Sequence, residues 1–522
     1  MLHATMPRST TEPALPLATV FAQAVADGPD RPLVIDGTST LTRADVAARA
    51  ATIRRRLQAA GVGAGDVVAV QLPNRAWTVA VVHAVWAVGA VPCVVTPIYR
   101  GSELASILSA ARPSAVVVPR AYGDVDYPAM AHDALAVAGH RAVVLAVDLD
   151  DDGADEAAVP SSSPAAAAPD DVALLMFTSG TTGRPKGVLH THRTLTVEAR
   201  SIIDVFGLGD DPVFMPSPLG HVTGLLYGII LPLLTGGAVV LSDRWDPAVA
   251  AETIEASGCR FTVAATPFLR GLTDAYRRRG TPSALEVFVC GGADIPESLV
   301  RDAKETMGTA VCRTYGSTEM PTLCIVRPGD PSEVVLRTEG RPLGGQARLV
   351  DIEIDPDGVP LGDLEARGPE LFVGYLDPAD NEAAFTRDGW FRTGDLARIL
   401  PHGEVAIAGR RKDLIVRGGE NISAKEVEDL LLTDPRILDV ALVGIPDDVM
   451  GERACAVVIS PGPLSLADLS RHLDTSGIAR QKYPEALWIV DSFPRTASGK
   501  VQKFQLRALA VAAIARGDVE RR

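Results

Sequence analysis

The chain is poor in cysteine and has fewer basic than acidic residues. Its 522 residues include six cysteines, and no two of them form a C-x-x-C pair. Most lie in apolar, strand-like runs, a pattern typical of reduced, buried thiols in a cytoplasmic protein, and they give no metal-binding framework. The 50 lysines and arginines are outnumbered by 65 aspartates and glutamates, for a formal net charge of −15. Because nucleic-acid binders normally carry a basic face, we expect no nucleic-acid partner.

Targeting and membrane-spanning signals are also missing. The N-terminus has no charged region followed by an apolar core, so we expect no signal peptide. Residues 77–98 contain no Asp, Glu, Lys or Arg, but Gly89 divides the run and Pro92 argues against one continuous helix. We therefore predict a buried helix followed by a buried strand here, and no membrane span.

The pattern along the chain predicts an α/β fold. Up to residue 310, short apolar strands alternate with helical segments such as 247–257, which indicates parallel sheets with helices on both faces. The acidic, Ala-, Pro- and Ser-rich segment 148–171 is predicted to be a flexible surface loop. Beyond residue 330 the pattern becomes β-rich. We predict a large N-terminal domain at 1–409, with parallel and mixed sheets plus a β-rich subdomain, and a small α+β domain at 410–522.

One segment is rich in hydroxyls and glycine. Residues 177–188 read FTSGTTGRPKGV, with four hydroxyls, three glycines and one lysine, and they overlap the end of an apolar run, 172–177, that predicts a strand. Such a loop suits polyphosphate, since glycines admit the ligand, hydroxyls donate hydrogen bonds and lysine supplies charge. Lys186 follows Pro185 and precedes Gly187, so the segment is not a Walker A loop, and a P-loop kinase is excluded. A plain Ser/Thr/Gly surface turn is the structural alternative.

Five motifs together identify a family resemblance. They are TSGTTGRPKG at 178–187, YGSTE at 315–319, TGD at 393–395, GRRKDLIVRGGENI at 409–422 and PRTASGK at 494–500. In this order the chain resembles the acyl-adenylate-forming enzymes, the AMP-dependent synthetases and ligases, from about residue 20 to its end. The resemblance implies a large ATP- and acyl-binding adenylation domain, a small mobile C-terminal domain and an active site between them. It also implies the reaction: a carboxylate attacks the α-phosphate of ATP, pyrophosphate leaves, and a thiol then displaces AMP.

The resemblance implies roles for the nucleotide-binding residues. The hydroxyl-rich loop would hold the β- and γ-phosphates through Thr178, Ser179, Gly180, Thr181, Thr182, Gly183 and Lys186. In the second motif, Tyr315 would stack on adenine beside Gly316 and Ser317, Thr318 would contact the α-phosphate, and Glu319 would ligate Mg²⁺. Asp395 would accept hydrogen bonds from the ribose with help from Arg410, and Gly291, Gly292 and Ala293 would lie against adenine and the acyl group. A metal bridged to phosphates needs only one or two protein carboxylates. The structural alternative for YGSTE is a turn with a capping glutamate. Taken alone, Thr-Gly-Asp and a Gly-Gly after a strand are more often simple turns.

The resemblance also implies catalytic and hinge residues. Lys500 would reach the α-phosphate and the substrate carboxylate during adenylation, and His221 would lie beside that carboxylate. Lys412 occupies the hinge position, about which the small domain would rotate to withdraw Lys500. The loop Gly418, Gly419, Glu420 and Asn421 would then approach the thiol, since adjacent glycines let the backbone pass close to a ligand. A buried core histidine and an exposed lysine are the structural alternatives for His221 and Lys412.

The acyl pocket is predicted to be neutral. Its expected lining comprises Val222, Leu225, Tyr227, Ala265, Phe268, Thr322 and Leu323, which offer no acidic partner for an amino group. An apolar acid is therefore favoured, as in the bacterial short- to medium-chain fatty acyl-CoA and cyclohexanecarboxylate-CoA ligases that these segments resemble. The glycine-rich 418–421 loop favours coenzyme A as the acceptor. A carrier-protein acceptor, an aryl acid, a non-catalytic nucleotide-binding regulator and a homodimer stay open.

Overall fold

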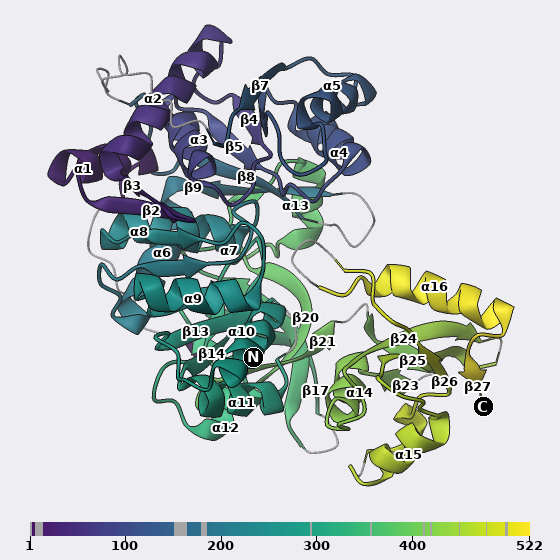
Figure 1. Cartoon of the computed structure of the whole chain (residues 1–522). Helices are drawn as coiled ribbons and strands as arrows, with labels where there is room; N and C mark the ends of the chain where they lie inside the picture. The colour runs from purple at the N-terminus through teal and green to yellow at the C-terminus, as the bar shows by residue number, and fades with distance from the viewer. Residues whose placement is uncertain are drawn as a thin grey trace.

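The computed structural model describes residues 3–5, 14–150, 164–178, 185–292, 295–354, 358–410, 413–417, 420–447, 449–476, 478–495 and 500–521. Within these ranges the strands form four sheets, three in the large N-terminal part and one in the C-terminal part (Figure 1). The sheets are mainly parallel in the first half of the chain and mainly antiparallel in the second. The predicted α/β fold class and the smaller C-terminal α+β unit are confirmed.

Two twisted sheets form the first half of the molecule. The first runs in the order β19 (Gly374–Tyr375), β9 (Lys186–Thr191), β8 (Val172–Thr178), β5 (Val91–Val94), β4 (Val67–Val70), β6 (Ala115–Pro119) and β7 (Val143–Val147). The second runs in the order β16 (Arg341–Pro342), β15 (Cys324–Ile325), β14 (Ala310–Tyr315), β13 (Val287–Gly291), β12 (Phe261–Ala264), β10 (Val213–Met215), β11 (Val239–Leu241), β2 (Pro32–Asp36) and β3 (Ser39–Thr42).

Helices separate and cover these two sheets. Between them lie α1 (Leu17–Asp27), α2 (Arg43–Ala59), α3 (Ala76–Ala87), α6 (His192–Phe206), α7 (Val222–Leu225), the π-helix η1 (Leu226–Ile230) and α8 (Leu231–Thr235), whose apolar side chains share one core with strands of both sheets. Helices α4 (Gly101–Ala111) and α5 (Tyr127–Val137) cover the outer face of the first sheet, and α9 (Pro247–Ser257), α10 (Thr266–Arg279), α11 (Glu297–Met307) and α12 (Ser332–Arg337) cover that of the second.

The charge-free run at 77–98 folds as the sequence predicts. It forms α3, which is buried from Ala76 to Trp86, a turn at Gly89 (φ +79°) and the buried strand β5. Such a helix can be apolar all round because core surrounds it on every side. No helix in the described part of the chain is both long and apolar enough to cross a membrane. All six cysteines are buried free thiols, as expected.

A third sheet leads to the C-terminal unit. It runs in the order β1 (His3–Thr5), β17 (Gln346–Ile354), β18 (Pro360–Arg367), β20 (Phe391–Ile399) and β21 (Val405–Arg410), with α13 (Pro378–Ala384) before β20. The fourth sheet contains β23 (Glu420–Ile422), β22 (Ile415–Arg417), β25 (Gly451–Ile459), β26 (Ala486–Ile489) and β27 (Glu520–Arg521), with β24 (Asp439–Asp447) paired to β25. Its helices are α14 (Ala424–Leu431), α15 (Leu466–Asp474), the 3-10 turn η3 (Arg480–Lys482) and α16 (Lys503–Arg516).

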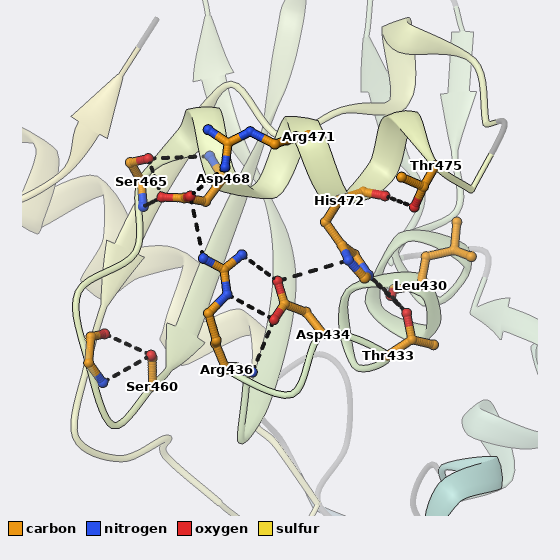
Figure 2. Close-up of polar contacts among 11 residues, drawn as sticks. Leu430, Thr433, Asp434, Arg436, Ser460, Ser465, Asp468, Arg471, His472 and Thr475 are labelled. Carbon is orange, nitrogen blue, oxygen red and sulfur yellow. Dashed lines mark hydrogen bonds and ion pairs between the residues drawn. The ribbon is translucent and has the colours of Figure 1, made fainter.

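A polar network ties α14 to α15 in the C-terminal unit (Figure 2). Arg436 donates to Asp434 at 2.7 Å and reaches Asp468, beside the start of α15, at 3.4 Å. His472 Nε2 lies 2.8 Å from the Thr433 hydroxyl, just after α14. One contact with the large domain is made by Ser423, which caps α14 and also donates to the carbonyl of Ala408 in β21 at 2.8 Å. The cap residue of α14 therefore also joins the C-terminal unit to the third sheet.

Candidate functional site

The hydroxyl- and glycine-rich segment connects two paired strands. Thr178 ends β8 and is the cross-strand partner of Lys186, which begins β9. The Lys186 ammonium lies 3.1 Å from the Asp380 carboxylate and 4.8 Å from the centre of the Tyr375 ring. Residues 179–184, which include the predicted phosphate ligands Ser179, Gly180, Thr181, Thr182 and Gly183, lie outside the described part of the chain. The strand predicted at 172–177 is confirmed as β8, and Lys186 lies opposite its last residue.

The Tyr315–Leu323 segment is a tightly closed loop. Tyr315 ends β14, and its carbonyl accepts a hydrogen bond from the Leu323 amide at 2.9 Å. Ser317 N–H donates to the Met320 carbonyl at 2.9 Å, which closes a smaller turn inside. A Cβ at Gly316 would lie 1.9 Å from the Pro321 carbonyl oxygen, so only glycine fits there. The closed loop presents Thr318 and Glu319 from a fixed backbone.

Two neighbouring strands hold Thr318 and Glu319. His190 on β9 is fully buried, and its Nε2 donates to the Thr318 carbonyl at 2.7 Å. Burial lowers the pKa of His190 to about 4, so this ring is neutral. The Phe372 amide donates to the Glu319 carbonyl at 2.8 Å, and the Tyr375 hydroxyl donates to its carboxylate at 2.7 Å. The backbone and carboxylate of Glu319 are thus both fixed by the 372–375 segment.

Glu319 suits a magnesium ion bridged to phosphate. It is a partly exposed carboxylate, it follows the hydroxyl of Thr318, and these are the hard oxygen donors that Mg²⁺ prefers. Tyr375 donates to Oε1 and leaves acceptor capacity on the carboxylate. The donor set therefore fits a metal that takes its remaining ligands from nucleotide and water.

A second polar chain links Tyr315 to the third sheet. Asp395 in β20 is the cross-strand partner of Arg410 in β21, and Arg410 Nε lies 3.1 Å from its carboxylate. The Tyr315 hydroxyl donates to the other oxygen of Asp395. Burial and the charge of Asp395 raise the pKa of Tyr315 well above its usual value, so it remains a donor. The Thr-Gly-Asp motif therefore lies in a strand, and the alternative of a simple turn is wrong.

Lys500 of the C-terminal unit reaches this group of residues. A Cβ at Gly292, which has φ +81°, would lie 3.7 Å from Lys500 Cε. Burial and the charge of Arg410 lower the pKa of Lys500, while Asp395 and Glu319 partly oppose the change. Lys500 therefore shares an electrostatic environment with residues of the large domain far away in sequence.

His221 faces the same lysine. Burial and the Lys500 charge lower the pKa of His221 to about 4, so the ring is neutral at pH 7. Its Nε2 is buried and has no hydrogen-bond partner among the described residues. An unsatisfied buried polar atom is costly, which is typical of a site that completes its hydrogen bonds with a ligand. A neutral ring can donate one hydrogen bond to a carboxylate.

The residues expected to line the acyl pocket fall into two groups. Leu225 and Tyr227 belong to the core between the first two sheets, with partly buried Val222 packed against it, whereas Phe268 packs edge-to-face on Trp245 in the core outside the second sheet. The Tyr227 hydroxyl lies 2.9 Å from that of Thr322, so these two are brought together. It also donates to the buried carboxylate of Glu198 at 2.6 Å. Glu198 is therefore a buried acidic neighbour of Tyr227 that the sequence did not indicate.

Several predicted residues cannot be placed. Ala293, Lys412, Gly418 and Gly419 lie outside the described residues, and Glu420 and Asn421, expected in a loop, belong to β23. The sequence did not single out His190, Tyr375, Glu198 or Glu370. A signal was present for Glu198, which stands on the apolar stripe Leu195, Ala199 and Ile202 of α6.

Comparison with known proteins finds relatives that match most of the chain. The chain matches the model of the AMP-binding enzymes over residues 21–376 and that of the AMP-binding enzyme C-terminal domain over residues 426–500. It is 33% identical to the medium-chain fatty-acid–CoA ligase of Escherichia coli K12 over 94% of this chain and 90% of that one. It is 36% identical to the 2-hydroxy-7-methoxy-5-methyl-1-naphthoate–CoA ligase of Streptomyces carzinostaticus, over 95% of this chain and 93% of that one.

Among solved structures, MatB from Rhodopseudomonas palustris is similar throughout. Its ATP-bound crystal structure matches with a TM-score of 0.84 at 27% identity, covering 95% of this chain and 99% of that one. The apo form of MatB matches over the same shares with a TM-score of 0.73 at 28% identity. The arrangement in this chain is thus more similar to the ATP-bound form. On its motifs, its fold and these matches, the chain belongs to the AMP-binding enzyme family and is an acyl-adenylate-forming ligase.

Proposed function

We propose that this ligase activates an apolar carboxylic acid with ATP and transfers the acyl group to coenzyme A. In the first step a carboxylate oxygen attacks the α-phosphorus, an acyl-adenylate forms and pyrophosphate leaves. In the second step the thiol sulfur attacks the acyl carbon, AMP leaves and the thiol proton passes to solvent. The apolar class is supported by the fatty-acid and naphthoate ligases among the relatives, and the acceptor by the fact that both are coenzyme A ligases.

The observation that carries the proposal is the position of Lys500. It comes from the C-terminal unit, yet it lies beside Gly292 and shares an electrostatic environment with Glu319, Asp395 and His221. A cation placed where a carboxylate must meet a polyphosphate reduces the repulsion between two anions and stabilises charge that develops at phosphorus. A fixed position also supplies much of the advantage of an enzyme in joining two substrates.

The other residues divide the remaining tasks of the first step. Thr318 and Glu319 would hold the α-phosphate and Mg²⁺, which supplies charge neutralisation when bound. Asp395 would accept hydrogen bonds from the ribose hydroxyls, because Tyr315 and Arg410 hold the carboxylate in one orientation. His221 would donate to the substrate carboxylate from its Nε2, which has no partner in the ranges that the structure describes. Lys186 and the hydroxyl-rich loop would hold the pyrophosphate that leaves.

A carrier-protein acceptor is the alternative for the second step. We propose a domain boundary at 409/410, next to the last residue of β21, and a rotation of the small unit there between the two steps. Rotation would break the contact between Ser423 and the Ala408 carbonyl and withdraw Lys500.

The test is a panel of carboxylic acids incubated with ATP and Mg²⁺, with and without coenzyme A. Pyrophosphate release that depends on an alkyl or aryl acid, with acyl-CoA formed only when coenzyme A is present, is expected. Lys500→Ala should lose most pyrophosphate release. Lys503→Ala is the matched control, because that lysine pairs with Glu428 at 2.6 Å within the C-terminal unit. Equal activity of the two variants would contradict the role of Lys500.

A further inference from the structure

Two buried glutamates lie behind the loop that carries Thr318 and Glu319. Glu198 on α6 and Glu370 after β18 are both fully buried, at 0% exposure. Each has one carboxylate oxygen, Oε2, without a hydrogen-bond partner in the described part of the chain. Burial and the nearby Glu370 carboxylate raise the pKa of Glu198 to about 8, and burial raises that of Glu370 to about 7. Two buried carboxylates this poorly paired are costly to ionise together.

Glu198 is connected to the loop through Tyr227 and Thr322. The Tyr227 hydroxyl donates to Glu198 Oε1 at 2.6 Å and lies 2.9 Å from the Thr322 hydroxyl. Tyr227, on η1, is itself kept protonated because burial and the charge of Glu198 raise its pKa well above the usual value. Thr322 lies three residues after Glu319 in the closed loop. The Tyr227 hydroxyl therefore connects the Glu198 carboxylate to that loop.

Glu370 is connected to the same loop from the other side. Ser201, one turn after Glu198 on α6, lies 3.4 Å from Glu370 Oε1. The carboxylate packs against glycine backbone, since a Cβ at Gly344 or Gly368 would lie 1.8 or 2.7 Å from one of its oxygens. Two residues after Glu370, the Phe372 amide donates to the Glu319 carbonyl. The segment ends at Tyr375, whose hydroxyl holds the Glu319 carboxylate.

We propose that Glu198 and Glu370, in their protonated state, are positioning residues that fix Glu319 and Thr318 for adenylation. The inference rests on the proposed function. Among the described residues, the titratable groups that interact with the pair are Tyr227 from η1 and, for Glu198, the Glu370 carboxylate, while Ser201 and Thr322 are neutral. When the pair loses its protons at alkaline pH, two negative charges face each other without solvent, and the hydrogen bonds through Thr322 and the 370–375 segment are displaced. The rate of adenylation then falls because the loop no longer holds Glu319 in place.

The experiment compares Glu198→Gln and Glu198→Leu with the wild type. Glutamine keeps an acceptor for Tyr227 and cannot ionise, whereas leucine removes the acceptor. The matched control is Glu255→Gln, because Glu255 also accepts from a tyrosine, Tyr276, at 2.7 Å, but it is exposed on α9. For each variant, kcat and the KM for Mg-ATP are measured by acid-dependent pyrophosphate release from pH 6 to 9.5.

The wild-type rate is expected to decrease at alkaline pH. Glu198→Gln should keep kcat at pH 7 within about threefold and lose that decrease. Glu198→Leu should raise the KM for Mg-ATP or lower kcat at every pH, and Glu255→Gln should match the wild type. An alkaline decrease in Glu198→Gln identical to that of the wild type would overturn the proposal. Normal kinetics in folded Glu198→Leu would overturn it as well.

A second measurement separates this inference from the proposed function. Thermal unfolding of the full chain between pH 6 and 9.5 reports the pair without any substrate. The wild-type Tm should fall more steeply with pH than that of Glu198→Gln. Equal pH dependence of the two Tm values would reject the proposed role of the protonated pair even if adenylation is observed. Absence of acid-dependent pyrophosphate release in the wild type would reject the proposed function while the unfolding comparison still decides on the pair.

Discussion

The hydrogen bond from Tyr375 to Glu319 gives a sharp test of how the carboxylate that we propose binds Mg²⁺ is positioned. Tyr375 donates to Glu319 Oε1 at 2.7 Å, and its ring lies under the Lys186 ammonium, 4.8 Å away. Tyr375→Phe removes the hydroxyl but keeps the ring, so the contact with Lys186 is preserved. A hydrogen bond to a charged group contributes about 1.5–3 kcal/mol. At about 1.4 kcal/mol for each factor of ten, we expect kcat/KM for Mg-ATP to fall roughly ten- to a hundredfold.

Tyr276→Phe is the matched control for this prediction. Tyr276 donates to Glu255, also at 2.7 Å, and is more deeply buried than Tyr375, but it lies on α10 in the core outside the second sheet. Its loss should lower Tm without changing kcat/KM. The assay is pyrophosphate release at varied ATP and Mg²⁺, together with thermal unfolding of both variants. If Tyr375→Phe and Tyr276→Phe had the same kcat/KM, the assignment of Glu319 and of its support by Tyr375 would be refuted.

Three further predictions concern Lys500, the closed loop and the buried glutamates. Lys500→Ala should lower the rate of acid-dependent pyrophosphate release roughly 100-fold or more, because it removes a cation from the reacting phosphorus; stopped assays with a fixed acid measure it. Gly316→Ala should lower the free energy of unfolding by about 1–3 kcal/mol, because a Cβ there overlaps the Pro321 carbonyl. Gly63→Ala should leave it unchanged, because Gly63 has open space around it, and denaturant unfolding compares the two variants. Glu198 and Glu370 bind more protons in the folded than in the unfolded chain between about pH 4.5 and 8. The free energy of unfolding should therefore fall as pH rises through that range, by at most about 5 kcal/mol for Glu198. Denaturant unfolding at pH 6 and at pH 9 measures the decrease.

The motifs could be recognised from sequence because each is a short run whose residues act together. The strand before the hydroxyl-rich segment, the helix at 247–257 and the buried helix and strand of 77–98 follow from local periodicity and appear as expected. Tyr315, Glu319, Asp395, Arg410 and Lys500 were chosen from four separate motifs. These residues come together only because of the strand order of two sheets and the position of the C-terminal unit. A resemblance supplied that arrangement, and the residue pattern alone did not.

The supporting residues could not be predicted because their partners are distant in sequence. Tyr375 and Glu319 are separated by 56 positions, His190 and Thr318 by 128, and Ser201 and Glu370 by 169. Glu198 left a trace, because a glutamate on the apolar stripe of α6 conflicts with the helical pattern. Local conflicts of this kind indicate that a buried partner exists, but they do not identify it.

The position of the Thr-Gly-Asp motif shows a different limit. Thr-Gly-Asp is rich in turn-forming residues, and Gly394 has φ +76°, yet the motif lies in β20 where the register with β18 shifts. On the other side of β20, Asp395 pairs with Arg410 in β21 and lies within reach of Tyr315. Sheet pairing with β18 and β21 therefore overrides local turn preference, which a single sequence cannot reveal.

The most direct test of the central claim is mass spectrometry of the products formed from ATP and a panel of alkyl and aryl acids. Without coenzyme A, the account predicts enzyme-bound acyl-adenylate and pyrophosphate for at least one apolar acid. With coenzyme A, it predicts one acyl-CoA and one AMP for each ATP consumed. Formation of ADP with an acyl phosphate, or ATP consumption that does not depend on any acid, would contradict it.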